Sequence, residues 1–299
     1  MSESAPLLGL LLDVDGPIAS PVTRTIAIDS IVSDLVTLAD AGIPIVFNTG
    51  RSDAFIRDEV VKPLVAAGLP DHARIFAVCE KGAVWFEITQ AGAGEIEVSS
   101  ELAVPAAYGQ AIETLVSEQF ADHMFFDHTK RAMVSVEQHK HVESADYLQQ
   151  QRAFDAEAFA EMGRHDLGIE HNGASAAASD GLVGYRIDST IISTDIESVK
   201  LGKDLGALRA IEMLLPGGPL PTQWRTVGDS RTDYAMADWL HEQGYTVAHV
   251  DVRPADGVPH TPYPVLTAGE LIHDEAGAAF LTRWVEMVRG DATQDGDVR

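Results

Sequence analysis

An unbroken apolar run near the start of the chain ends abruptly in acidic residues. Residues 7–12 read Leu-Leu-Gly-Leu-Leu-Leu, and Asp13 and Asp15 follow immediately. A run of this length without alternating polar residues is typical of a strand buried on both faces. Such strands lie at the centre of parallel sheets that helices cover on both sides. The run therefore predicts an α/β core.

Helical and extended patterns alternate after this strand. Residues 25–41 carry apolar side chains at helical intervals and are followed by an apolar strand pattern at 43–47. A second helix is expected over residues 52–67 and a further strand over 75–78. This alternation indicates βαβ units and a doubly wound, Rossmann-like sheet.

The alternation breaks in the middle of the chain and resumes near its end. Between residues 84 and 193 we expect strands at 84–88, 132–137 and 182–187, helices at 106–119 and 144–162, and loops at 92–94 and 172–181. We interpret this block as a smaller α+β domain, residues 89–189, inserted into a core of residues 1–88 and 190–299. In the core we then expect a helix at 203–215, strands at 223–227 and 245–250, and a closing helix at 281–288.

Composition limits the partners of the chain. It has 299 residues, one cysteine (Cys79) and no apolar stretch long enough to span a membrane, so we expect a cytoplasmic protein that contacts no membrane. The net charge of −25 opposes binding to nucleic acid, whose phosphates must be neutralised by cations. An anionic small molecule would need local cations or a metal ion for its attraction. The sequence does not indicate the oligomeric state.

Chemistry is expected first at Asp13 and Asp15, which follow the first strand. Side chains two residues apart on an extended segment point the same way, so both carboxylates converge at the carboxyl end of that strand. Open α/β sheets bind their ligands there. Converging carboxylates repel one another unless a cation or a shared proton neutralises them, and Mg²⁺ with its oxygen ligands suits this site.

Further polar groups follow the later strands of the core. Thr49, Gly50 and Arg51 stand before a helix N-terminus, where hydroxyl and N–H groups can donate to a phosphate. A lysine at the start of the helix near residue 203 could pair with the acids, and Lys203 and Lys200 are both candidates. Asp229 and Asp233 follow the strand at 223–227 and suit a metal ligand with a neighbouring partner.

Taken together, these motifs resemble those of the haloacid dehalogenase (HAD) superfamily of phosphatases and phosphotransferases. Asp13 and Asp15 match its first motif, Thr49 the second, Lys203 the third, and Asp229 with Asp233 the fourth. The resemblance implies that Asp13 is the nucleophile that becomes phosphorylated and that Asp15 is the general acid and base.

The resemblance also implies the remaining roles. Thr49 and Lys203 would hold the transferring phosphoryl group. Mg²⁺ would bind Asp13, the main-chain carbonyl of Asp15, and Asp229, with Asp233 close behind.

The place of the insertion, between Thr49 and Lys203, resembles members with a large C2-type cap, and Glu80-Lys81-Gly82-Ala83 resembles a turn of the Cof-like and sugar-phosphatase branch. Lys81 stands where that branch usually has Asn. We take Gly50, Arg51 and Lys81 as candidates for substrate binding in the core. Lys130, Arg131 and Arg186 are the candidates in the inserted domain.

The motifs predict a Mg²⁺-dependent phosphatase for a small phosphorylated metabolite, such as a sugar phosphate or a phosphoglycerate-type compound. One alternative is a phosphotransferase of the phosphomannomutase type, in which a hydroxyl replaces water. A second alternative is a binding protein that retains the fold without catalysis. The presence of all the acidic motif residues and of Thr49 argues against it.

Overall fold

The computed structural model describes residues 5–293 and 296, and these form two compact units. The first unit comprises described residues of the ranges 1–97 and 202–299, and the second comprises residues 98–201. The sequence had suggested boundaries at 88/89 and 189/190. The first boundary falls later because β4 (Val84–Thr89) and β5 (Gly92–Ala93) extend the sheet of the first unit. The second falls later because β12 (Ser193–Ser198) pairs with two strands of the inserted unit.

The first unit is built on one sheet with the strand order β15-β14-β13-β1-β2-β3-β4-β5. The pairs from β15 to β3 are parallel, and β4 and β5 continue the sheet in antiparallel fashion. Its remaining strands are β1 (Gly9–Leu12), β2 (Ile45–Asn48), β3 (Ile75–Cys79), β13 (Gln223–Gly228), β14 (Thr246–Asp251) and β15 (Val265–Leu266). A further short strand, β6 (Glu97–Val98), spans the boundary between the units.

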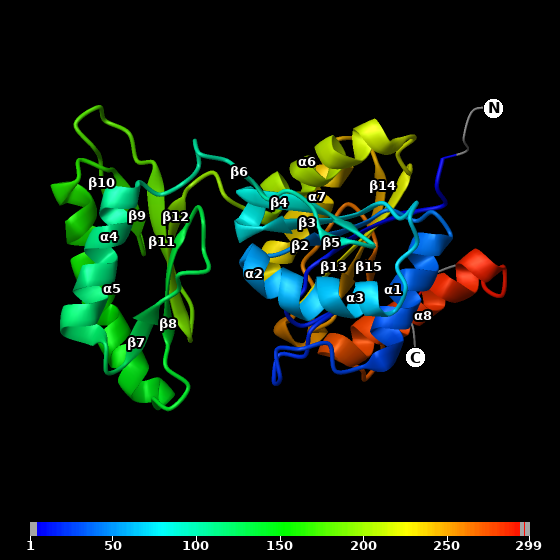
Figure 1. Ribbon diagram of the computed structural model, residues 1–299, viewed down its shortest axis with the longest axis horizontal. Helices are drawn as coiled ribbons and strands as arrows, with labels where there is room; N and C mark the ends of the chain where they lie inside the picture. The colour runs from blue at the N-terminus through cyan, green and yellow to red at the C-terminus, as the bar shows by residue number, and fades with distance from the viewer. Residues whose placement is uncertain (1–4, 294–295, 297–299) are drawn as a thin grey trace. The chain divides into compact units, whose positions relative to one another are not determined.

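Helices cover both faces of this sheet. On one face lie α1 (Asp29–Asp40), α3 (Lys62–Ala66) and α8 (His273–Arg289), and on the other lie α6 (Lys203–Leu214) and α7 (Tyr234–Glu242) (Figure 1). The helix expected at 52–67 is continuous, because α2 (Asp53–Ile56), a π-helical turn over Arg57–Val61 and α3 follow one another. Beneath α6 and α7, Leu11, Val46, Trp224 and Leu240 belong to one buried apolar cluster.

Strand β1 lies at the centre of the sheet, between β13 and β2. Leu10 faces Arg225 on one side and Ile45 on the other, and the four residues of β1 are all buried. This confirms the central strand that the leucine run predicted and, with it, the doubly wound fold. Parallel strands end at a common edge, so the segments after β1, β2, β13 and β14 meet there.

The second unit has its own sheet and its own core. Its strand order is β10-β9-β11-β12-β8-β7, and the β9–β11 pair alone is parallel among the pairs of its described residues. The strands are β7 (Met124–Phe126), β8 (Val134–Gln138), β9 (Ile169–His171), β10 (Ala174–Ala176), β11 (Tyr185–Ser189) and β12. Helices α4 (Ala106–Leu115) and α5 (Ser144–Arg164) pack against it through a buried cluster that includes Tyr108, Val136 and Phe154.

Several local predictions were wrong. β10 lies within the expected loop at 172–181, and β5 lies within the one at 92–94. The last helix begins at His273 instead of residue 281, and α7 was not predicted at all. Among the described residues, no helix is both long and apolar enough to cross a membrane.

Candidate active site

Lys203 and Asp13 form a buried ion pair at the carboxyl edge of the first sheet. Asp13 follows β1, and Lys203 is the first residue of α6. The Lys203 Nζ lies 2.7 Å from Asp13 Oδ1 and donates to the carbonyl of Asn48, also at 2.7 Å. Asn48 in turn donates from Nδ2 to the Lys203 carbonyl at 2.9 Å. The end of β2 therefore fixes both the backbone and the ammonium group of Lys203.

The loop after β13 supplies two more carboxylates. Asp233 Oδ1 lies 2.7 Å from the same Lys203 Nζ. Its other oxygen accepts hydrogen bonds from the N–H groups of Asp229 and Ser230 and from the Ser230 hydroxyl. Asp233 thus closes its own loop as a capping residue and holds Asp229 at the edge of the site.

The pKa values of these groups reflect burial and uneven pairing. Burial raises the pKa of Asp13 well above its ordinary value; Lys203 opposes the shift, and Asp233 and Asp15 add to it. Burial also raises the pKa of Asp229, with Asp233 contributing. The pKa of Asp233 is lowered, because Lys203 and Ser230 outweigh the opposite effect of its burial. One lysine therefore does not neutralise the whole group.

This donor set fits a divalent cation. Asp13, Asp229 and Asp233 each offer one carboxylate oxygen, and these oxygens all lie within 4.8 Å of one another. Oxygen ligands of this kind suit Mg²⁺, and its charge would stabilise the ionised form of Asp13, whose pKa is raised by burial and, to a smaller extent, by the neighbouring carboxylates. The side chain of Asp15 is not a member of the group, so its expected contribution to a metal remains its main-chain carbonyl.

Arg51 holds the Asp15 carboxylate in a fixed orientation. Its Nε donates to Asp15 Oδ2 and its Nη2 to Asp15 Oδ1, both at 2.8 Å. Two parallel bonds of this type fix both the position and the plane of a carboxylate. The sequence predicts that Arg51 binds substrate. In the structure its guanidinium contacts Asp15, the residue expected to act first as the acid and then as the base.

Thr49 and Gly50 form a loop that a strained turn clamps in place. Thr49 is fully buried, and its hydroxyl accepts the N–H of Arg51 at 3.1 Å. Glu80 and Lys81 have φ values of 48° and 54°, in the left-handed region that side chains rarely adopt. The N–H groups of Glu80 and Lys81 bond to the carbonyls of Arg51 and Thr49, and the Lys81 carbonyl accepts the N–H of Gly202.

The turn therefore connects the Thr49 loop to the start of α6. A Cβ atom on Gly50 would lie 3.7 Å from Lys81 Cε, so the Lys81 side chain lies against Gly50. This contact keeps the Lys81 cation beside the loop expected to hold phosphate. Backbone strain of this kind persists where the surrounding structure enforces it, often at functional sites.

Between the two lysine candidates, the contact with Asp13 belongs to Lys203. Lys200 is exposed, and its N–H bonds to the hydroxyl of Ser198. Lys203 is the first residue of α6, and from there its ammonium reaches the carbonyl of Asn48 at the end of β2.

The candidates in the second unit lie on its own sheet and loops. Lys130 and Arg131 lie between β7 and β8. Arg186, on β11, bonds through Nε and Nη2 to the buried carboxylate of Glu197 and through Nη2 to the Leu201 carbonyl. Their proposed contacts with substrate stay predictions.

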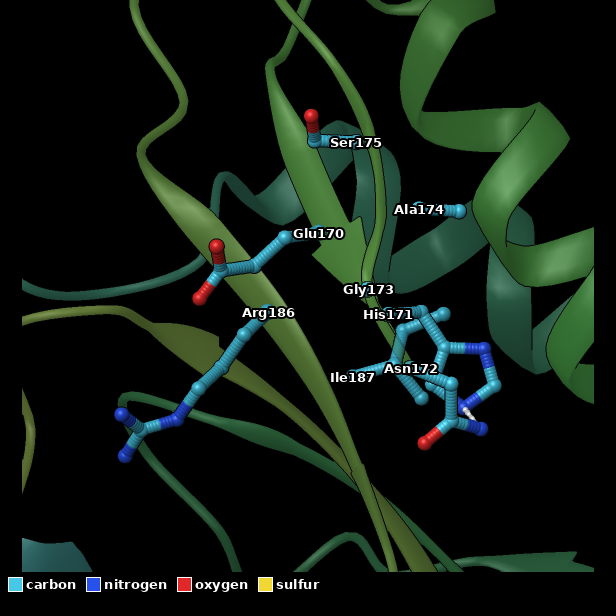
Figure 2. A pocket seen from close by; sticks show the side chains of 8 residues that line it. All are labelled: Glu170, His171, Asn172, Gly173, Ala174, Ser175, Arg186 and Ile187. Atoms are coloured by element: carbon cyan, nitrogen blue, oxygen red, sulfur yellow. Dashed lines mark hydrogen bonds between the residues drawn. The ribbon is translucent and has the colours of Figure 1, made fainter.

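Arg186 also lines a polar pocket of the second unit with a volume of about 290 Å³. Figure 2 shows Glu170 and Arg186 extending to one side of this pocket, and His171 and Asn172 lying together on another. The neighbouring residues Ile169 and Ile187 belong to the apolar cluster under the helices, so Glu170 and Arg186 project from the opposite face of the sheet.

Sequence reasoning missed two residues beside Asp229. Arg253 follows β14 and His273 begins α8, and each places a nitrogen 3.9 Å from Asp229 Oδ2. Neither belongs to a short motif, and each is more than 20 residues from Asp229 in the sequence. No local pattern in the chain signals their approach.

No protein-family model and no curated protein matches this chain. Solved structures do. It is similar to the C-terminal domain of trehalose-6-phosphate phosphatase from C. albicans, with 13% identity over 96% of this chain and 94% of that one and a TM-score of 0.60. A haloacid dehalogenase-like hydrolase from Bacteroides thetaiotaomicron matches with 11% identity over 93% and 99% of the two chains and a TM-score of 0.57. The IMP-nucleotidase of Plasmodium falciparum matches with 9% identity over 98% and 64%, with a TM-score of 0.53.

These similarities define the class of fold. The chain has the fold of the haloacid dehalogenase-like hydrolases, as the four motifs had predicted. At such low identities the likeness concerns the fold alone, and the activity has to be argued from the residues of the site.

Proposed function

We propose that this protein is a Mg²⁺-dependent phosphatase that hydrolyses a small phosphorylated metabolite through an aspartyl phosphate on Asp13. The observation that carries the proposal is the position of the Lys203 ammonium, 2.7 Å from carboxylate oxygens of both Asp13 and Asp233. A buried cation beside a buried carboxylate can bind an anionic phosphoryl group while that carboxylate attacks its phosphorus atom.

In the first step, an oxygen of Asp13 attacks phosphorus and the bond to the leaving alcohol breaks. Oδ1 of Asp13 already accepts Lys203 and the Val14 N–H, so Oδ2 is the nucleophile we propose. Asp15 gives a proton to the departing alcohol oxygen. The hydroxyl of Thr49 and the ammonium of Lys203 hold the phosphoryl oxygens as charge develops on them.

In the second step, water attacks the phosphorus of the aspartyl phosphate and Asp15 accepts a proton from it. The Asp13–phosphorus bond breaks, which regenerates the carboxylate and releases inorganic phosphate. Arg51 keeps the Asp15 carboxylate in one orientation for both proton transfers. Asp13, Asp229 and the Asp15 carbonyl would hold Mg²⁺, with Asp233 behind them; the ion supplies positive charge to the transferring phosphoryl group.

A sugar phosphate is the substrate class that the chemistry favours. The pocket of the second unit is lined by carboxylate, guanidinium, imidazole, amide and hydroxyl groups, which hydrogen-bond well to hydroxyl-rich molecules (Figure 2). One of the similar structures is named as a phosphatase of trehalose 6-phosphate, which is a sugar phosphate. Lys81, Lys130 and Arg131 are the cations that we propose for additional anionic contacts.

The test measures release of inorganic phosphate from a panel of sugar phosphates, nucleoside monophosphates and phosphoglycerates. Wild type, Asp13→Asn and Asp58→Asn are compared with Mg²⁺ and with a chelator. Asp58 is a matched control, because it is an exposed acid that forms a surface ion pair with Lys62. We expect release that needs Mg²⁺, persists in Asp58→Asn and disappears in Asp13→Asn.

Activity that survives in Asp13→Asn would contradict the nucleophile. Activity that persists in chelator would contradict the metal requirement. Transfer of phosphate to a second sugar, with little free phosphate and dependence on a bisphosphate activator, would replace hydrolysis by the phosphotransferase alternative.

A further inference from the structure

Two basic side chains flank the Asp229 carboxylate without forming a hydrogen bond to it. Arg253 Nη1 and His273 Nδ1 each lie 3.9 Å from Asp229 Oδ2. Hydrogen bonds between N–H and oxygen span about 2.7–3.2 Å, so neither group is hydrogen-bonded to Asp229, and the guanidinium of Arg253 acts on it through charge across a short gap. Arg253 is the permanent cation of the two.

The backbone holds both side chains in this place. The N–H of Val252 donates to the Gly228 carbonyl at 3.0 Å, and the N–H of His273 donates to the Val252 carbonyl at 2.9 Å. Asp251 Oδ1 accepts the N–H of Arg253 at 2.8 Å. The end of β14 is therefore fixed between the residue before Asp229 and the start of α8.

This arrangement is kept at a cost to the fold. His273 has a φ of 51°, in the left-handed region that residues with a side chain adopt less readily than glycine. Within residues 5–293, Arg253 Nε and His273 Nδ1 are buried atoms without a hydrogen-bond partner. A positive φ and unpaired nitrogen atoms in the two residues beside one carboxylate point to a role for that approach.

Asp229 is also confined on a second side. A Cβ atom on Gly16 would lie 2.8 Å from Asp229 Cγ, so the loop after β1 packs directly against this side chain. Lys203 pairs with Asp13 and Asp233, whereas Asp229 faces Arg253 and His273. Arg253 also pairs through Nη2 with Asp256 Oδ2 at 2.5 Å. Its charge is therefore shared between Asp256 and Asp229, the one carboxylate of the group that Lys203 does not directly pair.

We propose that Arg253 is a positioning residue that holds Asp229 in the metal-free protein and weakens the affinity of the site for a divalent cation. A cation that binds Asp229 has to compete with the attraction of Arg253 and is repelled by its charge. The site then exchanges its cation readily with solution. This inference rests on the proposed function, because it takes Asp229 as a metal ligand.

The expected effect is a gain in metal affinity when the charge is removed. Arg253 is 41% exposed, so solvent screens its field and the effect is modest. We expect Arg253→Gln to bind Mg²⁺ about fivefold more tightly than wild type, which is the range of one partly exposed charge interaction. The difference narrows as ionic strength rises, because salt screens exposed charges.

Calorimetric titration of the metal-free protein with Mg²⁺ at low ionic strength tests this directly. The variants are Arg253→Gln, the charge-conserving Arg253→Lys, and Arg283→Gln as a matched control. Arg283 lies ten residues after His273 on α8, about 15 Å along the helix, and pairs with Glu286. Its loss changes the net charge equally without acting on Asp229.

Tighter binding in Arg253→Gln, with Arg253→Lys and Arg283→Gln within twofold of wild type, supports the proposal. A lower melting temperature of metal-free Arg253→Gln that Mg²⁺ restores supports it independently. An unchanged or weaker affinity in Arg253→Gln, or an equal gain in Arg283→Gln, overturns it and leaves the proposed phosphatase intact. Absence of Mg²⁺ binding in wild type overturns both this inference and the metal site of the proposed function.

Discussion

Replacement of Lys203 by methionine removes the cation at the centre of the site while keeping most of the length of its unbranched side chain. Lys203 is 8% exposed and contacts Asp13, Asp233 and the Asn48 carbonyl, each at 2.7 Å. Removing one partner of a buried ion pair costs about 3–5 kcal/mol, because the other partner keeps an uncompensated charge. Asp233 retains three hydrogen bonds from its own loop, so we expect the lower end, about 3 kcal/mol.

The contribution of Lys203 is fully present at neutral pH. Burial alone would lower the pKa of this lysine, but Asp13 and Asp233 outweigh burial and raise it above its ordinary 10.5. A group with a raised folded pKa stabilises the fold below its unfolded pKa and loses that effect only as the pH rises further. Unfolding measured at pH 7 therefore reports the whole contribution.

Urea and thermal unfolding of metal-free Lys203→Met measure the loss of stability. A deficit of about 3 kcal/mol corresponds to a melting temperature lower by about 6–12 °C for a unit of this size. Mg²⁺ should recover part of the deficit, since it supplies positive charge to the same carboxylates. Phosphate release should fall by about 10³-fold or more, because a cation that stabilises the transferring group is lost.

Lys200→Met is the matched control, since Lys200 is exposed and lies three residues earlier. Its stability should stay within about 0.5 kcal/mol of wild type, as is usual for surface substitutions. A loss below about 1 kcal/mol in Lys203→Met, or activity within tenfold of wild type, would refute the reasoning.

Three further outcomes are expected. Arg51→Gln should lower kcat about tenfold to a hundredfold with a smaller change in KM, because Asp15 loses its fixed orientation; steady-state phosphate release measures this. Gly16→Ala should weaken Mg²⁺ binding at least about tenfold in calorimetry, because φ is 95° and the new Cβ would lie 2.8 Å from Asp229 Cγ. Metal-free Asp13→Asn should melt at a higher temperature than wild type at pH 7 and at the same temperature below about pH 3.8, because burial raises the pKa of the carboxyl from that value.

Each outcome has a control or a contradicting result. Gly42→Ala has a comparable φ of 80° but nothing within 4 Å of the new Cβ, so it should lose stability without losing Mg²⁺ affinity. An unchanged kcat in Arg51→Gln would mean that the two hydrogen bonds from Arg51 to Asp15 are not needed for turnover. A metal-free Asp13→Asn protein that melts below wild type at pH 7 would show that the ionised Asp13 stabilises the fold, against the direction of its pKa shift.

Much of the first unit could be predicted because its signals are local. The leucine run is buried at the centre of the sheet. The apolar periodicity at 25–41 found α1, which begins later, at Asp29, and the helix expected at 203–215 is α6. A strand buried on both faces leaves a continuous apolar run, and a helix with one buried face leaves a spacing of three to four residues. Both patterns can be read from neighbouring residues alone.

The second unit was harder to predict because its strands are short and half exposed. β10 has three exposed residues, Ala174–Ala176, and no apolar alternation. β12 was missed, although it pairs with both β8 and β11, and this omission moved the predicted boundary to 189/190. Pairing of this kind depends on residues distant in sequence, and β propensity depends strongly on that context.

The sequence by itself determined which residue types stand at the ends of the core strands: Asp13 and Asp15, Thr49, and Asp229 with Asp233. Only the tertiary structure decided that Lys203 contacts Asp13, that Arg51 holds Asp15, and that Arg253 and His273 approach Asp229. The physical reason is the parallel sheet. It brings the ends of distant strands to one edge, where partners are chosen by strand order and by the first turn of each helix.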